Sequence, residues 1–191
     1  MKRLIATIFF VYVLTFCSVS AQEKQTPAPP SMKRPEPGPE RARLSFLVGN
    51  FTTETKMLPG PMMKKGATGT GTSVISWGLD SMFLTVDEQS VNPVLGNYKG
   101  HGMLGYDPQE KQYVLSMFNN FGDLPQYRGS FVGDTLVLAT KVSAPRGSFD
   151  QKLQWFRDGA LVRLRILNDF GQGFRPVIDQ TSTPSSGAAK K

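Results

Sequence analysis

The chain has 191 residues, a formal net charge of +7, one cysteine and one histidine. A single cysteine cannot form an intramolecular disulfide, and one histidine without further thiolates cannot complete an ordinary structural zinc site, so no metal site is expected. The basic residues are scattered along the chain rather than gathered into one run, so we expect no nucleic-acid partner.

The first 21 residues are typical of a secretory leader. Two basic residues precede an apolar run over 4–17, and small residues lead up to Ala21, as signal peptidase requires. The apolar run is too short for a good transmembrane span. We therefore expect cleavage near Ala21, export to the periplasm or beyond, and no transmembrane segment in the mature chain. Lipid anchoring at Cys17 is not expected, because Phe16 stands where a lipidation motif usually carries a small residue.

The composition divides the rest of the chain into a linker, one domain and a tail. Residues 22–39 are rich in proline, which disfavours helix and sheet and predicts a disordered linker. Residues 181–191 lack apolar periodicity and predict a disordered tail. Residues 40–180 form one domain of about 140 residues, large enough to bury a single core.

A short helix is predicted at the start of the domain, over residues 39–49. Pro39 suits the first turn, and Gly49 suits the position just after the helix. Leu44, Leu47 and Val48 are expected to share one apolar face. Such a helix could close one end of a barrel.

After Gly49 the apolar period changes to two, which is typical of strands. Strands are predicted over 51–57, 67–77, 82–91, 98–106, 113–119, 126–132, 135–142, 149–157, 160–168 and 175–180. The turn Asp158-Gly159 is the strongest hairpin signal. This spacing predicts an all-β fold, a single antiparallel barrel of about ten strands whose last strand closes on the first.

Three motifs carry a resemblance to known families. The segment 46–51, Phe-Leu-Val-Gly-Asn-Phe, resembles the Gly-x-Trp start of lipocalin-like (calycin) barrels, with Phe51 in place of tryptophan. The segments 100–107 and 129–136 are similar to strand ends of a bacterial family, domain of unknown function 1579. The resemblance covers about residues 44–180 and implies a lipocalin-like barrel without an established activity. Around residues 176–178 the chain departs from the family pattern, which leaves the pairing of the last strand open.

No catalytic set is recognisable. The motif Gly-x-Ser-x-Gly is absent, and Asp87 and Glu88 are adjacent in a predicted strand, so their side chains point to opposite faces and are expected in solvent. A single axial histidine can hold haem, but an ordinary hydrogen-bonded strand histidine is the preferred interpretation of His101, and no cofactor is expected. If the protein is an enzyme, His101 and Tyr106 are the candidate acid and base.

Arg163 and Arg165 share one face of a predicted strand whose opposite face is wholly apolar. Binary patterning places both arginines in solvent. In a barrel with a wet lumen they would instead bind a carboxylate or a phosphate as bidentate donors.

The leading hypothesis is an exported, non-enzymatic barrel that binds a small, largely apolar or amphipathic ligand. Its candidate ligand-binding residues are Trp77, His101, Met103, Tyr127, Arg163 and Arg165. Two alternatives stay open: an enzyme of lipocalin-like fold, and an envelope interaction module that uses the outer face of the barrel. The oligomeric state does not follow from the sequence.

Overall fold

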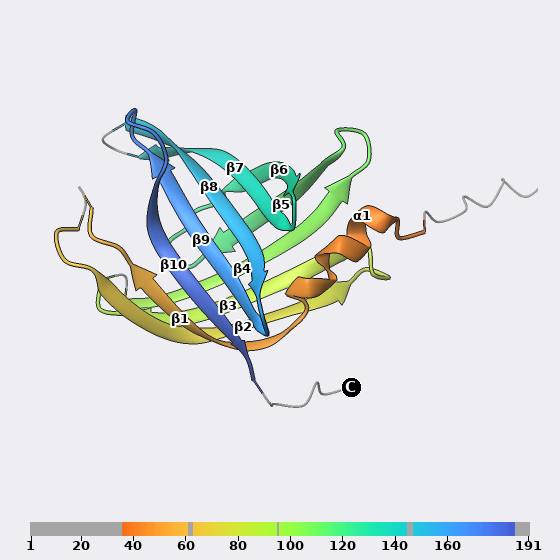
Figure 1. Cartoon of the computed structure of the whole chain (residues 1–191), viewed down its shortest axis with the longest axis horizontal. Coiled ribbons are helices and arrows are strands. Elements are labelled where there is room, and N and C mark those ends of the chain that lie inside the picture. Colours follow the sequence, from red (N-terminus) through yellow and green to blue (C-terminus); the bar gives the residue numbers. More distant parts are fainter. Residues whose placement is uncertain (1–35, 61–62, 95, 145–146, 186–191) are drawn as a thin grey trace, which may run out of the picture. The chain divides into compact units, whose positions relative to one another are not determined.

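Ten antiparallel strands form one closed barrel in the computed structural model, which describes residues 36–60, 63–94, 96–144 and 147–185. The hydrogen-bonded order is β1-β10-β9-β8-β7-β6-β5-β4-β3-β2, so the last strand closes on the first (Figure 1). This confirms the all-β barrel prediction. The predicted leader, most of the linker and residues 186–191 lie outside the described residues. No helix in the described part of the chain has the length and hydropathy needed to cross a bilayer.

The elements follow one another along the chain with short connections. They are α1 (Pro39–Ala42), the 3-10 helix η1 (Arg43–Leu47), β1 (Gly49–Met57), β2 (Ala67–Gly78), β3 (Phe83–Asn92), β4 (Gly96–Asp107), β5 (Gln112–Asn119), β6 (Gln126–Val132), β7 (Thr135–Ala144), β8 (Gly147–Asp158), β9 (Leu161–Asp169) and β10 (Arg175–Pro184).

The largest shift from the predicted boundaries is at the end of β10. The predicted domain ended at residue 180, but residues 181–184 continue the strand and pair with β1 from Glu54 to Phe51. The same residues lack the apolar pattern of a half-buried strand, so their pairing with β1 depends on register rather than on their own sequence. The departure from the family pattern near residue 176 coincides with a β-bulge between Pro176 and Ile178.

Alternation of side chains sets the inner face of each strand. In β1, Phe51, Thr53, Thr55 and Met57 are buried while the residues between them are exposed. In β3, Leu84 and Val86 are almost fully buried. Because the period is two, these positions fix which later residues of the same strand face the lumen.

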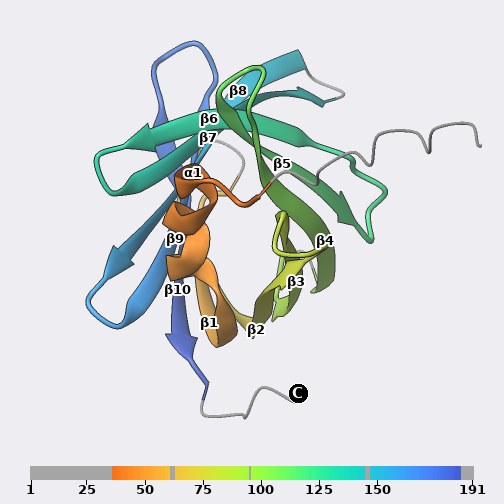
Figure 2. The same ribbon diagram turned by 90° about the vertical axis from the view of Figure 1, so that its right-hand side faces the viewer.

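The helical segment lies over one end of the barrel (Figure 2). Leu44 and Leu47 of η1 are fully buried and belong to the main apolar core. Val48 was predicted on the same face, but η1 ends at Leu47 and Val48 adopts extended backbone, with 38% of its surface exposed. The helix is one residue shorter than the apolar pattern suggested, because the chain must already be extended where it enters β1.

Polar contacts fix the helical segment to the barrel. The Tyr113 hydroxyl donates to the Glu40 carbonyl oxygen over 2.7 Å, and Arg43 donates to the Gly133 carbonyl oxygen over 2.8 Å. The Arg43 guanidinium also lies 3.9 Å from the centre of the Phe131 ring, within the range of a cation–π contact. The helical segment therefore fills this end of the barrel, and hydrogen bonds and a cation–π contact hold it there.

Close backbone approach between β6 and β7 requires glycine at position 129. A Cβ there would overlap the carbonyl oxygen of Val137. We expect Gly129→Ala to lower the free energy of unfolding by about 1–3 kcal/mol, as overpacking does elsewhere. Gly60→Ala is the matched control, because its Cβ would meet open space. Urea unfolding of both variants checks this, and an equal effect at the two positions would contradict the tight packing.

Candidate functional site

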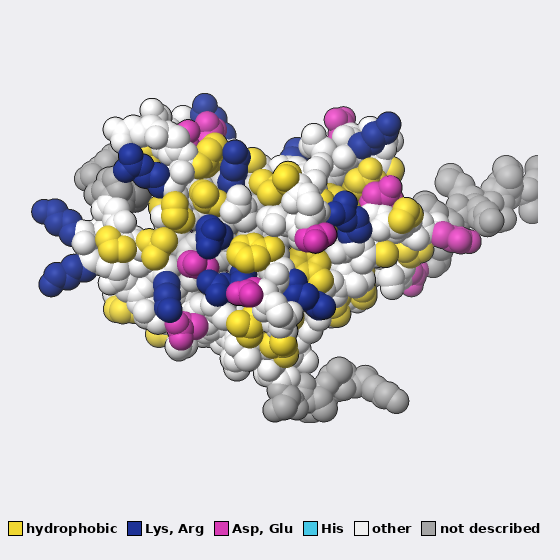
Figure 3. Space-filling view, viewed as in Figure 1, with side chains coloured by type: hydrophobic (Ala, Val, Ile, Leu, Met, Phe, Trp, Pro, Cys, Tyr) yellow, Lys and Arg dark blue, Asp and Glu magenta, His cyan; other side chains and the backbone are white. Residues whose placement is uncertain are grey.

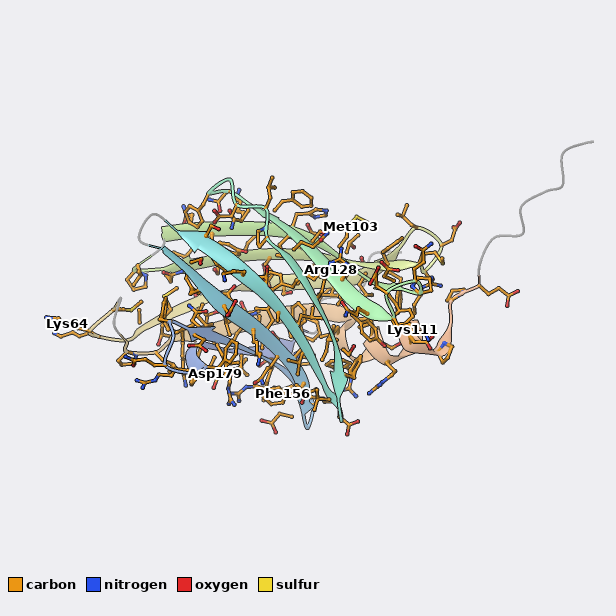
Figure 4. All side chains as sticks on the ribbon, turned by 90° about the horizontal axis from the view of Figure 1, so that it is seen from above. Lys64, Met103, Lys111, Arg128, Phe156 and Asp179 are labelled. Carbon is orange, nitrogen blue, oxygen red and sulfur yellow. The ribbon has the colours of Figure 1, made fainter. Side chains whose placement is uncertain are left out.

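Two cavities lie inside the barrel, away from the helical segment. Their volumes are about 170 and 120 Å³, and Glu88, Tyr98, Leu164 and Ile166 line both. The first extends toward β1 and β10, and the second toward β5, β6 and β8. The described barrel thus has an apolar, filled end under η1 and a lumen with space and polar groups toward the opposite end. In Figure 4, the label Lys111 marks the filled end, beside the helical segment, and the label Lys64 marks the opposite end.

Glu88 of β3 provides the carboxyl group between the two cavities. Leu84 and Val86 precede it on the same face of the strand, so alternation brings Glu88 into the lumen. Its pKa is raised above the ordinary value of a glutamate because burial disfavours the charged form, and a hydrogen bond from Gln180 opposes that shift. Gln180 in turn accepts a 2.9 Å hydrogen bond from Thr55. Glu88 as a whole residue is half-buried, and it lines the wall of both inner cavities.

Two tyrosines lie near this carboxyl. Tyr98 occupies space over Gly100, where a Cβ would come within 2.6 Å of the tyrosine hydroxyl. Burial raises the pKa of Tyr98, and the nearby charge of Glu88 adds to the shift. Burial likewise raises the pKa of Tyr127 to about 12, with a contribution from Asp123. Both phenols are therefore neutral hydrogen-bonding groups at physiological pH.

A chain of hydrogen bonds connects Tyr127 to β8 and β9. Its hydroxyl donates to Gln151 over 2.6 Å, and the Gln151 amide donates to Asn168 over 2.9 Å. The network spans β6, β8 and β9. It holds the Tyr127 ring in place at the wall of the second cavity.

The wall of the barrel opens between the β5–β6 loop and β7. Strand β6 pairs with β7 only up to Ala139, so residues 140–144 of β7 have no partner on that side and pair with β8 alone. A cavity of about 430 Å³ lies here, lined by Leu124, Pro125, Val142 and their neighbours. It shares Asn119, Pro125 and Tyr127 with the inner cavity. We call this opening the portal.

Of the candidate residues from the sequence, Tyr127 lines the lumen. Trp77 is partly buried and packs against the core. His101 and Met103 alternate with the buried residues of β4 and so face outward. Arg163 and Arg165 alternate with buried Val162 and Leu164 and also face outward. The structure does not bring these six residues together.

The two arginines take part in a charged network on the outer wall. Arg163 lies 2.9 Å from Asp179 and 3.7 Å from Asp158, and Arg165 lies 3.6 Å from Asp179 and over the ring of Phe156. Figure 4 shows Phe156 and Asp179 on the same side of the barrel, and Figure 3 shows basic and acidic side chains interspersed on this wall. Their acidic partners on the wall account for both arginines without a ligand.

His101 pairs with Asp87 on the outer wall. Its Nδ1 atom lies 2.7 Å from Asp87 Oδ1, and both side chains are more than half exposed. Tyr106 lies five residues further along β4 and therefore on the opposite face, about 16 Å away at the usual rise per residue. The candidate acid and base do not share a site. Among the described residues, no group of three metal-ligating side chains is found either.

A further hollow, of about 730 Å³, lies on the outer wall over β1 to β4 and β10. Half of its outward-facing residues are threonines, namely Thr52, Thr70, Thr72, Thr181 and Thr183. A groove open to water cannot desolvate a ligand as an enclosed lumen does. The lumen is therefore the stronger candidate site.

Sequence reasoning missed Glu88 and Tyr98. Glu88 was expected in solvent together with Asp87, whereas Asp87 faces water and Glu88 faces the lumen. The signal was present in the alternation of Leu84 and Val86, which continues to Glu88. For Tyr98 the small inward residues Gly100 and Gly102 gave no comparable signal.

Comparison with known proteins bears on the family and the fold. The family model described as "Protein of unknown function (DUF1579)" matches residues 36–160. The crystal structure of Rv2717c from M. tuberculosis superposes with a TM-score of 0.56 and 16% sequence identity, over 78% of this chain and 99% of that one. At that identity the likeness concerns the fold alone. A search of curated proteins gave no match.

Proposed function

The chain belongs to the DUF1579 family of proteins of unknown function, and we propose that its barrel binds a small, amphipathic ligand in the lumen. The observation that carries the proposal is the pair of cavities that meet at Glu88 and Tyr98. Ligand sites of this kind combine apolar walls with a few convergent polar groups. Here Leu164, Ile166 and Trp155 would contact the apolar part of the ligand, and Glu88 and Tyr98 its polar end.

The portal would give the ligand a route from the outside of the barrel into the lumen. Leu124 of the β5–β6 loop lines the portal and exposes 71% of its surface, and Phe121 of the same loop exposes 52%. Apolar side chains at the mouth of a barrel favour transfer of an apolar molecule from water or from a carrier surface. We further propose that the protein acts after export, which the leader-like residues 1–21 support.

The proposed site is tested by a substitution that places a larger side chain in the lumen. Ile166 lines both cavities, so Ile166→Phe should occupy much of their shared space. We expect 1-hexanol to bind the unmodified protein in isothermal titration calorimetry and to bind Ile166→Phe at least about tenfold more weakly. Leu167→Phe is the matched control, because the adjacent residue of β9 faces outward.

Circular dichroism of both variants establishes that they are folded. Equal binding by Ile166→Phe and the unmodified protein would contradict a site in the lumen. The absence of any binding by the unmodified protein would contradict the proposed function itself.

A further inference from the structure

The ionisable side chains that line the two inner cavities are all acidic groups. The described side chains that line the two inner cavities include the Glu88 carboxyl and two phenols, but no lysine, arginine or histidine. The neighbouring polar groups are amides and hydroxyls, among them Gln180, Thr55 and Asn119. Lys141 lies in the outer cavity at the portal, and Lys99 and His101 line a hollow on the outer wall that Glu88 also borders.

A carboxyl in such a place is costly when ionised. A buried charge without a charged partner loses its hydration, and the amide of Gln180 compensates only part of that loss. The partner that would offset the loss is a cation brought in by the ligand. An anionic ligand would meet repulsion from Glu88 and find no basic group in the inner cavities to bind it.

We infer that the lumen selects ligands with an apolar body and a primary amino group, whose ammonium pairs with the Glu88 carboxylate. This rests on the proposed function and adds the chemical class of the ligand. Tyr98 and Tyr127 would accept hydrogen bonds from the remaining ammonium protons, since a phenol oxygen can accept as well as donate. Leu164 and Ile166 would contact the hydrocarbon part.

The affinity for an amine should rise with pH. Pairing requires the carboxylate, and burial raises the pKa of Glu88, so binding at low pH must remove a proton. The other titratable groups near Glu88 are Tyr98 and Tyr127 in the lumen, Asp123 at the portal, and Asp87, Lys99 and His101 in the hollow on the outer wall that Glu88 also borders. The two tyrosines stay neutral over the relevant range because burial raises the pKa of each. Below the pKa of Glu88 the affinity should increase by up to about tenfold per pH unit.

The experiment compares three six-carbon probes, hexylamine, 1-hexanol and hexanoate, by isothermal titration calorimetry at pH 7. We expect the unmodified protein to bind hexylamine at least about tenfold more tightly than 1-hexanol, and hexanoate most weakly. Glu88→Gln should lose the preference for the amine, so that it binds hexylamine no more tightly than 1-hexanol. Glu54→Gln and Asp87→Asn, which alter exposed carboxylates on the outer wall, should keep that preference.

Each contrary result has a defined meaning. If 1-hexanol binds and hexylamine binds no better, the amine inference is overturned while the proposed lumen site stands. The same holds if Glu88→Gln retains the amine preference, or if Glu54→Gln or Asp87→Asn removes it. If none of the three probes binds, both the proposed function and the inference drawn from it are overturned.

Discussion

Replacing Leu47 by alanine is expected to lower the free energy of unfolding by about 2–5 kcal/mol, the range for large-to-small changes in a core. Leu47 is fully buried at the end of the barrel, where it packs with Leu44 against the main core. Truncation leaves a cavity that the surrounding strands cannot close, because the barrel wall is continuously paired at this end. Typical domains have only about 5–15 kcal/mol of total stability, so the variant should unfold at much lower urea concentration.

Val48→Ala provides the matched control for this prediction. Val48 is the next residue in the chain and is 38% exposed, so its truncation removes less buried surface. We expect a loss of less than about 1 kcal/mol there. Urea denaturation of the two variants checks the difference. Equal losses would contradict the role of η1 in closing the barrel.

Glu88→Gln is expected to stabilise the protein at pH 8 and to leave it nearly unchanged at pH 4. Burial raises the pKa of Glu88 above the ordinary value of 4.5, so the folded protein holds this proton more tightly than the unfolded chain. Its contribution to stability is fully present below the unfolded value and is lost as pH rises through the folded pKa. Glutamine has the same shape, can accept the same hydrogen bond from Gln180, and carries no charge to desolvate.

Thermal unfolding between pH 4 and pH 8 measures this effect. For a domain of this size each kcal/mol gained raises the melting temperature by about 2–4 °C. Glu54→Gln is the matched control, because Glu54 is on the outer face of β1 and about half exposed. A Glu88→Gln profile parallel to that of the unmodified protein would contradict a desolvated carboxyl in the lumen.

The strands and the closing helix could be predicted from local patterns. Each strand has enough alternation or turn chemistry at its ends to be located, and Leu44 and Leu47 indicated the apolar face of the helical segment. The limits of β10 could not be predicted in this way. Residues 181–184 are polar or proline, and they join the sheet because β1 offers a partner in register.

The candidate site depends on features that local patterns do not reveal. Binary patterning assigns polar residues to solvent, yet Thr53, Thr55 and Glu88 face the lumen because alternation from apolar neighbours carries them there. The portal depends on how far β6 extends along β7, which is a non-local pairing. The hydrogen bonds of Gln180 likewise join residues distant in the sequence.

The most direct test is a crystal structure of the protein with 4-bromobenzylamine, in which anomalous scattering locates the bromine. We expect one ordered bromine peak in the lumen near Leu164, Ile166 and Trp155, with the amino group directed to Glu88. Bromine found only on the outer wall, for example in the threonine-lined hollow over β1 to β4, would contradict a ligand site inside the barrel.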